Sequence, residues 1–154
     1  MSNERFKTAD IRTINLVGRD TVDSAIKVHK LLGPGLLESS YTATVAHELR
    51  VRGHQVATQV TMPVEYCGVR LDIGYHIDMI VDDLVIVEFK AVAKILPVHK
   101  AQLLSHQRPS GMKLGFLINF HVRFLKDGIK RMVYAADCNK AQSPVRAFDT
   151  GGIH

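Results

Sequence analysis

Two charged side chains lie inside a run of residues that otherwise suits a buried β-strand. The run VIVEFKAV extends from Val85 to Val92, and its charged residues are Glu88 and Lys90. Residues two apart in a strand point to the same face, about 6.6 Å apart along the chain, so a carboxylate and an ammonium share one face. Because Glu and Lys are rarely fully buried unless they are paired, these residues alone favour an ion pair on a solvated sheet face.

A second carboxylate, Asp78, is predicted to lie beside Glu88. Asp82 and Asp83 form a short polar connection between two apolar runs, a pattern typical of a β-hairpin. Facing positions on adjacent strands have Cβ atoms about 5 Å apart, a gap that one cation with carboxylate ligands can bridge. Mg²⁺ is commonly held by one or two carboxylates plus substrate phosphate. Lys90 could then stabilise a deprotonated water and the charge on a phosphate under attack, which is the chemistry of phosphodiester hydrolysis.

Composition indicates one folded domain. The 154 residues are 46% hydrophobic and 23% charged, which argues against disorder. No apolar run approaches the roughly 20 residues that span a bilayer, and the polar start MSNERFKTAD lacks a signal-peptide core, so we expect a cytoplasmic protein without a membrane segment. Cys67 and Cys138 suggest neither a disulfide framework nor a zinc cluster. The net charge of +5 is compatible with a polyanionic partner.

The elements that must position these residues follow from periodicity. Apolar positions at helical spacing predict a helix over 20–32, stopped by Gly33-Pro34-Gly35, and a second helix over 36–52. Alternation and dense apolar runs predict the second half, with strands at 56–67, 69–81, 85–92 and 114–120 and a helix at 98–107. Gly74 is expected to make a bend or bulge, and Pro109 and Gly111 to close the last helix.

This order of elements predicts an α/β (α+β) fold with a mixed β-sheet flanked by helices. Residues 1–18 lack a clean period and are predicted to form a partly ordered N-terminal arm. Residues 139–154 gather Pro, Ser and Gly and are predicted to be a flexible C-terminal tail. The domain itself is expected to span 19–138.

Several motifs in order resemble a known family. IDMIVDDLVIVEFKA has the form of the PD-(D/E)xK nuclease motif, with Asp78 as the aspartate and Glu88-Phe89-Lys90 as ExK, while Ile77 replaces the usual proline. GLLESSY at 35–41 matches the GxxExxY signature, and LPVHKAQLL, GFLINF and LKDGIKR match further. From about Asn15 to Val133, the chain therefore resembles the GxxExxY family, a bacterial branch of the PD-(D/E)xK superfamily.

The resemblance implies a restriction-endonuclease-like core and a metal-dependent nuclease acting on DNA rather than RNA. It implies Mg²⁺, with Mn²⁺ as a substitute, held by Asp78 and Glu88, with Glu38 and the backbone carbonyl of Phe89 as further ligands. Lys90 would be catalytic. For Glu38 the alternative is a first-turn acid favoured by the helix dipole.

Two residues are candidates for supporting the substrate or the site. Tyr41 lies one turn after Glu38 and could orient it, although core packing is the favoured interpretation. Gln102 begins a QxxxY-like pattern whose fifth position here is His106. His99 and His106 are interpreted as surface or capping residues, because Mg²⁺ prefers oxygen ligands.

Two other classes of function stay open at this point. A nuclease-like fold can bind nucleic acid or a protein partner without cutting, because a fold alone does not fix a function. A homodimer whose acidic pocket merely binds cations is a third alternative. The full set of Asp78, Glu88 and Lys90 favours the enzyme.

Overall fold

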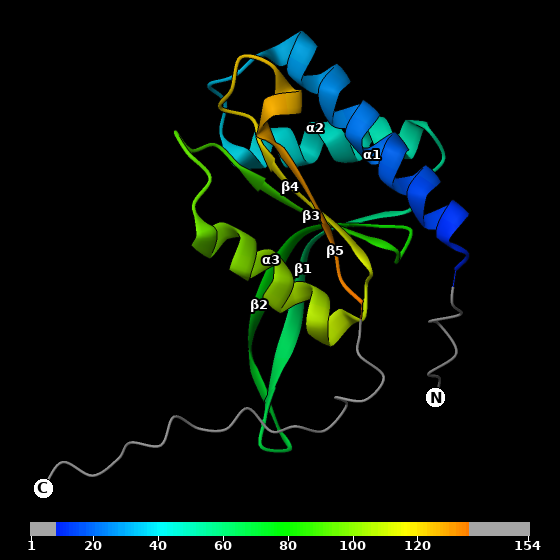
Figure 1. The fold of residues 1–154 in the computed structure, drawn as a ribbon, viewed down its shortest axis with the longest axis vertical. Coiled ribbons are helices and arrows are strands. Elements are labelled where there is room, and N and C mark those ends of the chain that lie inside the picture. The colour runs from blue at the N-terminus through cyan, green and yellow to red at the C-terminus, as the bar shows by residue number, and fades with distance from the viewer. Residues whose placement is uncertain (1–8, 136–154) are drawn as a thin grey trace, which may run out of the picture.

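The computed structural model describes residues 9–135, which form a single mixed sheet with helices on both faces (Figure 1). The first half contains α1 (Ile11–Leu32), α2 (Glu38–Val51), β1 (Val56–Tyr66), β2 (Val69–Val81) and β3 (Val85–Lys90). The second half contains α3 (Pro97–Ser110), β4 (Leu114–Asn119), the short 3₁₀ helix η2 (Leu125–Gly128) and β5 (Ile129–Val133). The predicted α/β class, with a mixed sheet flanked by helices, is confirmed.

The sheet has the strand order β1-β2-β3-β4-β5. All neighbouring strands are antiparallel except β3 and β4, which are parallel and in register from Val85↔Leu114 to Lys90↔Asn119. A parallel pair needs a crossover connection, and α3 supplies it. The carboxyl ends of β3 and β4 therefore lie at the same edge, which brings Lys90 next to Asn119.

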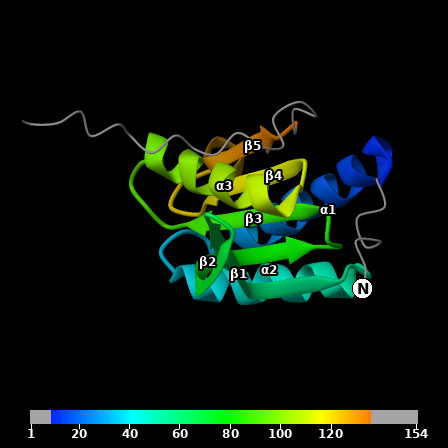
Figure 2. The ribbon, with the colours of Figure 1, turned by 90° about the horizontal axis from the view of Figure 1, so that it is seen from below.

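Alternation along β3 divides the core between two layers. Val85, Val87 and Phe89 pack against α1 and α2, whereas Ile86 packs with Leu103 of α3 on the other face. Figure 2 shows α2 and α3 on opposite sides of these strands. Glu88 and Lys90 lie two and four residues after Ile86 in the strand. Both charged side chains therefore point to the same face as Ile86, which α3 covers.

The first helix begins at Ile11, well before the predicted start at Asp20. Ile14 and Val17 are buried and continue the apolar stripe of Ala25 and Val28 toward the N-terminus. The polar residues between them hid this period in the sequence. The prediction of an N-terminal arm is therefore wrong for residues 11–18, which are the first turns of α1.

Gly18 explains why α1 can lie close to the sheet. A Cβ atom at this position would sit 2.6 Å from Leu114 Cδ2, too close for contact without movement. The absence of a side chain lets the helix backbone approach the start of β4.

The hairpin of β1 and β2 bends where the sequence predicted it. The register shifts between Pro63 and Val64, and Gly74 pairs with Pro63. A Cβ on Gly74 would lie 1.8 Å from the Met62 carbonyl oxygen, so glycine is required for this approach. Pro63 is tolerated because β1 is an edge strand of the sheet. The strand predicted over 56–67 is β1, which ends at Tyr66.

Pro109 was predicted to help close α3, but it lies inside the last turn of this helix. The stop comes from Gly111, which has φ 67° and ψ 7° and whose N–H bonds the Gln107 carbonyl. This left-handed conformation favours glycine and ends the helix regardless of the proline before it.

Some sequence expectations fall outside the described residues. The predicted tail at 139–154, Cys138 and the first eight residues all lie there. Cys67 is an exposed free thiol in the turn between β1 and β2. Within 9–135, no helix combines the length and apolar character needed to cross a bilayer.

A histidine ties three elements together at the β2–β3 turn. His54, just after α2, contacts Asp82 Oδ2 through Nδ1 over 2.5 Å and Asp20 Oδ2 of α1 through Nε2 over 2.7 Å. Asp82 also accepts the Gln55 N–H over 2.8 Å. These contacts therefore hold the β2–β3 turn against α1 and against the end of α2.

This contact predicts a pH-dependent stability. Burial acts to lower the pKa of His54, but hydrogen bonds to Asp82 and Asp20 outweigh it and raise the pKa above 6.5. The folded state thus keeps the proton to higher pH than the unfolded chain, so the stabilisation is complete below about pH 6.5 and is lost as pH rises through the folded pKa. Against His54→Gln, the parent should lose on the order of 1 kcal/mol as pH rises from about 6 through the folded-state pKa of His54, after allowance for solvent screening.

Urea unfolding at a series of pH values measures this difference. The exposed His47 of α2 offers a matched control, because His47→Gln should keep the pH dependence of the parent. Parallel curves for the parent and His54→Gln would contradict the assignment.

Candidate active site

The backbone ladder between β2 and β3 ends immediately before Asp78. Its last pair is Met79 with Val87. The N–H of Phe89 donates instead to Asp78 Oδ2, over 2.8 Å. A carboxylate thus replaces a strand carbonyl as the acceptor, and the structure brings Asp78 against β3 as the hairpin pattern predicted.

The Asp78 carboxyl group also lies beside that of Glu88. Burial raises the pKa of Asp78 to about 6, and the negative charge of Glu88 adds to the rise, while the Phe89 N–H and the Lys90 ammonium lower it. The two carboxyl groups are close enough to share a hydrogen bond when one is protonated. Like charges this close disfavour double ionisation unless a cation lies between them.

Glu88 is only 6% exposed and is held by a histidine from α3. His106 Nδ1 lies 2.6 Å from Glu88 Oε1, and the His106 side chain is itself buried. The interpretation of His106 as a surface or capping residue is therefore wrong. Its place at the fifth position of the QxxxY-like pattern that Gln102 begins was the available sign that it faces the sheet.

Lys90 lies at the last position of β3 and is partly buried. Its partner in the register, Asn119, is buried and accepts the Val92 N–H over 3.1 Å while its Nδ2 donates to the Val92 carbonyl over 2.8 Å. The Phe120 N–H bonds the Lys90 carbonyl over 2.9 Å. Asn119, which the sequence did not single out, thus fixes the chain directly after Lys90.

Glu38 reaches the same edge of the sheet from α2. It is the first residue of the helix, and its Oε1 accepts the N–H of Ala91 over 3.2 Å. Glu38 is therefore placed beside the end of β3. Within residues 9–135, however, no group of three His, Cys, Asp or Glu side chains is gathered closely enough to hold an ion.

Tyr41 lies in the core. It is fully buried, and its ring stacks on Phe120 with centroids 3.9 Å apart and planes 6° from parallel. Its hydroxyl donates to the Gly33 carbonyl over 2.6 Å and accepts the Leu36 N–H over 3.1 Å. Gly35, with φ 104°, allows the turn that these bonds close. Tyr41 therefore fixes the loop that sets the start of α2, and so the position of Glu38.

Gln102 and His99 lie apart from this group. Gln102 is exposed on α3, and in the part of the chain that the structure describes no hydrogen bond joins its side chain to Asp78, Glu88 or Lys90. His99 Nδ1 accepts the Leu96 N–H over 2.9 Å, so the predicted capping role of His99 is confirmed.

The two carboxylates suit one divalent cation. The Phe89 N–H holds one oxygen of Asp78, and His106 contacts one oxygen of Glu88, so the second oxygen of each group remains for a metal. Hard cations such as Mg²⁺ prefer these ligands. A cation would also offset the repulsion between two ionised carboxylates that lie side by side.

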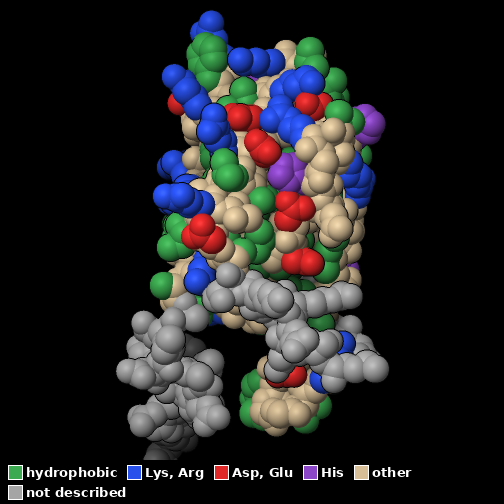
Figure 3. Space-filling view, turned by 90° about the vertical axis from the view of Figure 1, so that its right-hand side faces the viewer, with side chains coloured by type: hydrophobic (Ala, Val, Ile, Leu, Met, Phe, Trp, Pro, Cys, Tyr) green, Lys and Arg blue, Asp and Glu red, His purple; other side chains and the backbone are tan. Residues whose placement is uncertain are grey.

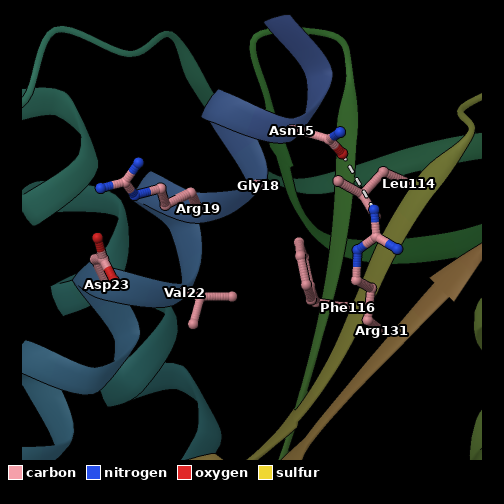
Figure 4. A pocket seen from close by; sticks show the side chains of 8 residues that line it. All are labelled: Asn15, Gly18, Arg19, Val22, Asp23, Leu114, Phe116 and Arg131. Atoms are coloured by element: carbon pink, nitrogen blue, oxygen red, sulfur yellow. Dashed lines mark hydrogen bonds between the residues drawn. The ribbon is translucent and has the colours of Figure 1, made fainter. Parts of the chain in front are cut away.

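Another hollow lies on the opposite face of the sheet, toward the far end of β4 (Figure 4). It is lined by Leu114 and Phe116 below α1, and Arg131 donates to Asn15 Oδ1 there over 3.1 Å. Leu114 is five positions from Asn119 along β4, or roughly 16 Å. This hollow is therefore separate from the carboxylates.

The fold and these residues define a class of protein. A model of the PD-(D/E)XK nuclease superfamily matches residues 15–132. The chain belongs to this superfamily, whose members are typically metal-dependent. No curated protein and no solved structure matches the chain.

The raised pKa of Asp78 predicts how acid affects the metal-free protein. Because the folded pKa of about 6 exceeds the unfolded value of 3.8, the folded state binds more protons between these values, and this site loses stability as pH rises through that window. Asp78→Asn should gain on the parent by up to about 2 kcal/mol from pH 4 to 7, a figure reduced for solvent screening.

Urea unfolding with chelator present measures this gain. Millimolar Mg²⁺ should return the lost stability to the parent and not to Asp78→Asn, because only the parent offers both carboxylates. A constant difference between the two proteins across this pH range would count against the pairing of Asp78 with Glu88.

Proposed function

We propose that the protein is a metal-dependent phosphodiesterase that hydrolyses nucleic acid, DNA rather than RNA. The observation that carries the proposal is the convergence of Asp78, Glu88 and Lys90 where the β2–β3 ladder stops. Membership of a nuclease superfamily supports the same reaction class. We further propose the GxxExxY branch, because Gly35, Glu38 and Tyr41 act as one unit at the start of α2.

The ligand set would consist of oxygen atoms. Asp78 and Glu88 would hold Mg²⁺ or Mn²⁺, with the backbone carbonyl of Phe89 and the carboxylate of Glu38 as additional ligands. Bound there, a divalent cation supplies Lewis-acid stabilisation of the phosphate and lowers the pKa of a coordinated water. Glu38 would need to exchange the Ala91 N–H for the ion.

The chain's own residues perform the remaining tasks. Lys90 places a positive charge beside Asp78, where it can stabilise negative charge that builds on the phosphate. His106 holds Glu88 in one orientation from behind, as outer partners of ligands commonly do. Asn119 keeps the chain after Lys90 in place, so the ammonium is presented from a fixed strand end.

Two substitutions separate the proposed roles of metal ligand and charge stabiliser. Lys90→Ala should lower the cleavage rate by about 10²- to 10³-fold, because it removes a group that stabilises the transition state. It should keep the rise in melting temperature that Mg²⁺ produces. Glu88→Gln should lose both, since a neutral amide binds the cation more weakly.

Cleavage of plasmid, linear, single-stranded and branched DNA and of RNA is measured with Mg²⁺, Mn²⁺ or chelator. Lys113→Ala is the matched control, because this exposed lysine precedes β4 at the other end of the strand. Equal metal-dependent cleavage by the parent and both site variants would reveal a contaminating nuclease. Nucleic-acid binding without cleavage would favour the non-catalytic module.

The proposed support of Glu88 by His106 gives a separate prediction. His106→Ala should weaken Mg²⁺ binding by about 10- to 100-fold, whereas His106→Gln, which retains a polar partner for Glu88, should lose less. The readout is the melting temperature over a titration of Mg²⁺. Equal Mg²⁺ affinity in His106→Ala and the parent would remove His106 from the site.

A further inference from the structure

A basic groove with an exposed aromatic ring borders the candidate site. It has a volume of about 610 Å³ and lies between the C-terminal half of α1 and the segment from β4 to η2, near the top of Figure 1. Lys30, Arg123, Phe124 and Lys126 line it, together with the turn at Gly33 and Pro34. Among the described residues, its lining contains three Lys or Arg side chains and no carboxylate.

These cations are available to a ligand. Lys30, Arg123 and Lys126 are exposed, and within residues 9–135 no carboxylate lies within ion-pair distance of any of them. Lys27 in the same helix differs, because it is paired with Glu48 over 2.8 Å. The groove therefore combines uncompensated positive charge with a concave surface, which suits a polyanion.

Phe124 adds a surface on which a base can stack. Its side chain is 54% exposed, and the Arg123 guanidinium lies 5.1 Å from the ring centroid. An aromatic ring presented to solvent beside basic side chains is the arrangement that binds unpaired bases and their phosphates together. In a duplex the base faces are stacked on each other and cannot reach the ring.

Both walls of the groove are fixed to the candidate site. His29 Nε2 lies 3.2 Å from the Phe120 carbonyl and 2.9 Å from that of Val122, and since carbonyls only accept, Nε2 carries the hydrogen. Phe120 in turn donates its N–H to the Lys90 carbonyl. Phe124 is four residues beyond Phe120, so its Cα lies within about 14 Å of that of Phe120, which is hydrogen-bonded to the last residue of β3.

The opposite wall has a similar link. The Gly33 carbonyl accepts the Tyr41 hydroxyl, and Tyr41 lies on the helix whose first residue is Glu38. The face on the right-hand side of Figure 1 is different in character, since acidic side chains lie among basic ones across its middle (Figure 3). The groove is therefore better suited to a nucleic-acid strand than that face.

We infer that this groove binds a single-stranded segment of the nucleic acid that flanks the phosphate at the candidate site. Phe124 stacks on an unpaired base, and Lys30, Arg123 and Lys126 contact the backbone phosphates. The inference rests on the proposed function for the position of the scissile bond, but the binding itself does not depend on catalysis. It specifies a substrate with an unpaired stretch, such as a frayed end, a flap or a single strand.

The test measures binding under conditions in which no cleavage occurs. Fluorescence anisotropy with chelator present compares a labelled oligothymidine with a duplex of the same length. The parent should bind the single strand more tightly. Phe124→Ala should weaken this binding about 5- to 100-fold and affect the duplex little, because base stacking on an aromatic side chain is lost. Tyr66→Ala, which removes an exposed ring from β1, is the control.

A second arm tests the charges. Lys30→Ala combined with Lys126→Ala should reduce the slope of log affinity against log salt by about 1.4, since each phosphate contact to a single strand contributes about 0.7. Lys113→Ala should leave the slope unchanged. Phe124→Leu accompanies Phe124→Ala, so that the loss of aromatic stacking can be measured with apolar bulk retained.

The outcomes separate this inference from the proposed function. Binding that depends on Phe124, without cleavage under any metal condition, would support the groove and overturn the nuclease. Metal-dependent cleavage together with unchanged single-strand affinity in Phe124→Ala would overturn the groove alone. No binding of the oligonucleotide by the folded parent at low salt, or binding of an acidic peptide in preference to it, would also overturn the groove.

Discussion

The hydrogen bond from the Phe89 N–H to Asp78 Oδ2 is the contact on which the candidate site depends. An interior strand needs an acceptor for every N–H, and an unmade bond there costs about 1–3 kcal/mol. By ending the β2–β3 ladder at Met79 and supplying a carboxylate, the chain satisfies the Phe89 amide while holding a negative charge against β3. The hydrogen bond from Phe89 to the Asp78 carboxylate also places Asp78 next to Glu88. The contact that completes the sheet therefore creates the electrostatic repulsion that a cation would relieve.

The sequence allowed β1 to β4 and the carboxylate pair to be predicted because they rest on local periodicity, whereas the short edge strand β5 was missed. Two apolar runs joined by Asp82 and Asp83 have few alternatives to a hairpin, and its register sets Asp78 against Glu88. His106 and Asn119 could not be found in this way. His106 contacts Glu88 only because the β3–α3–β4 crossover lays one helix over one face of the sheet, and Asn119 acts only because β3 and β4 are parallel and in register. Such contacts depend on tertiary packing, which periodicity within a segment does not contain.

The errors at the ends of helices have a related cause. The start of α1 was missed because its first turns bury Ile14 and Val17 against other elements while exposing Ile11 and Leu16, so the apolar pattern of the sequence does not match the buried stripe. The sequence pattern predicts that Pro109 helps to close α3, but this proline lies inside the last turn and the left-handed Gly111 ends the helix. Packing around the helix therefore sets the start of α1, whereas the local backbone freedom of a glycine sets the end of α3.

The stretch from Gly33 to Tyr41 shows how one local unit serves two surfaces. Tyr41 is buried against Phe120, and its hydroxyl closes the turn that begins α2, which directs Glu38 toward the end of β3. Phe120 is also the residue at which the chain leaves β4 for the basic groove, and His29 holds the segment that follows it. A shift of the Tyr41 ring would therefore move Glu38 and the wall that bears Phe124 together. A rigid aromatic stack in the core links Glu38 to the groove wall. The core packing itself therefore sets the position of a nucleic-acid strand bound in the groove relative to the carboxylates.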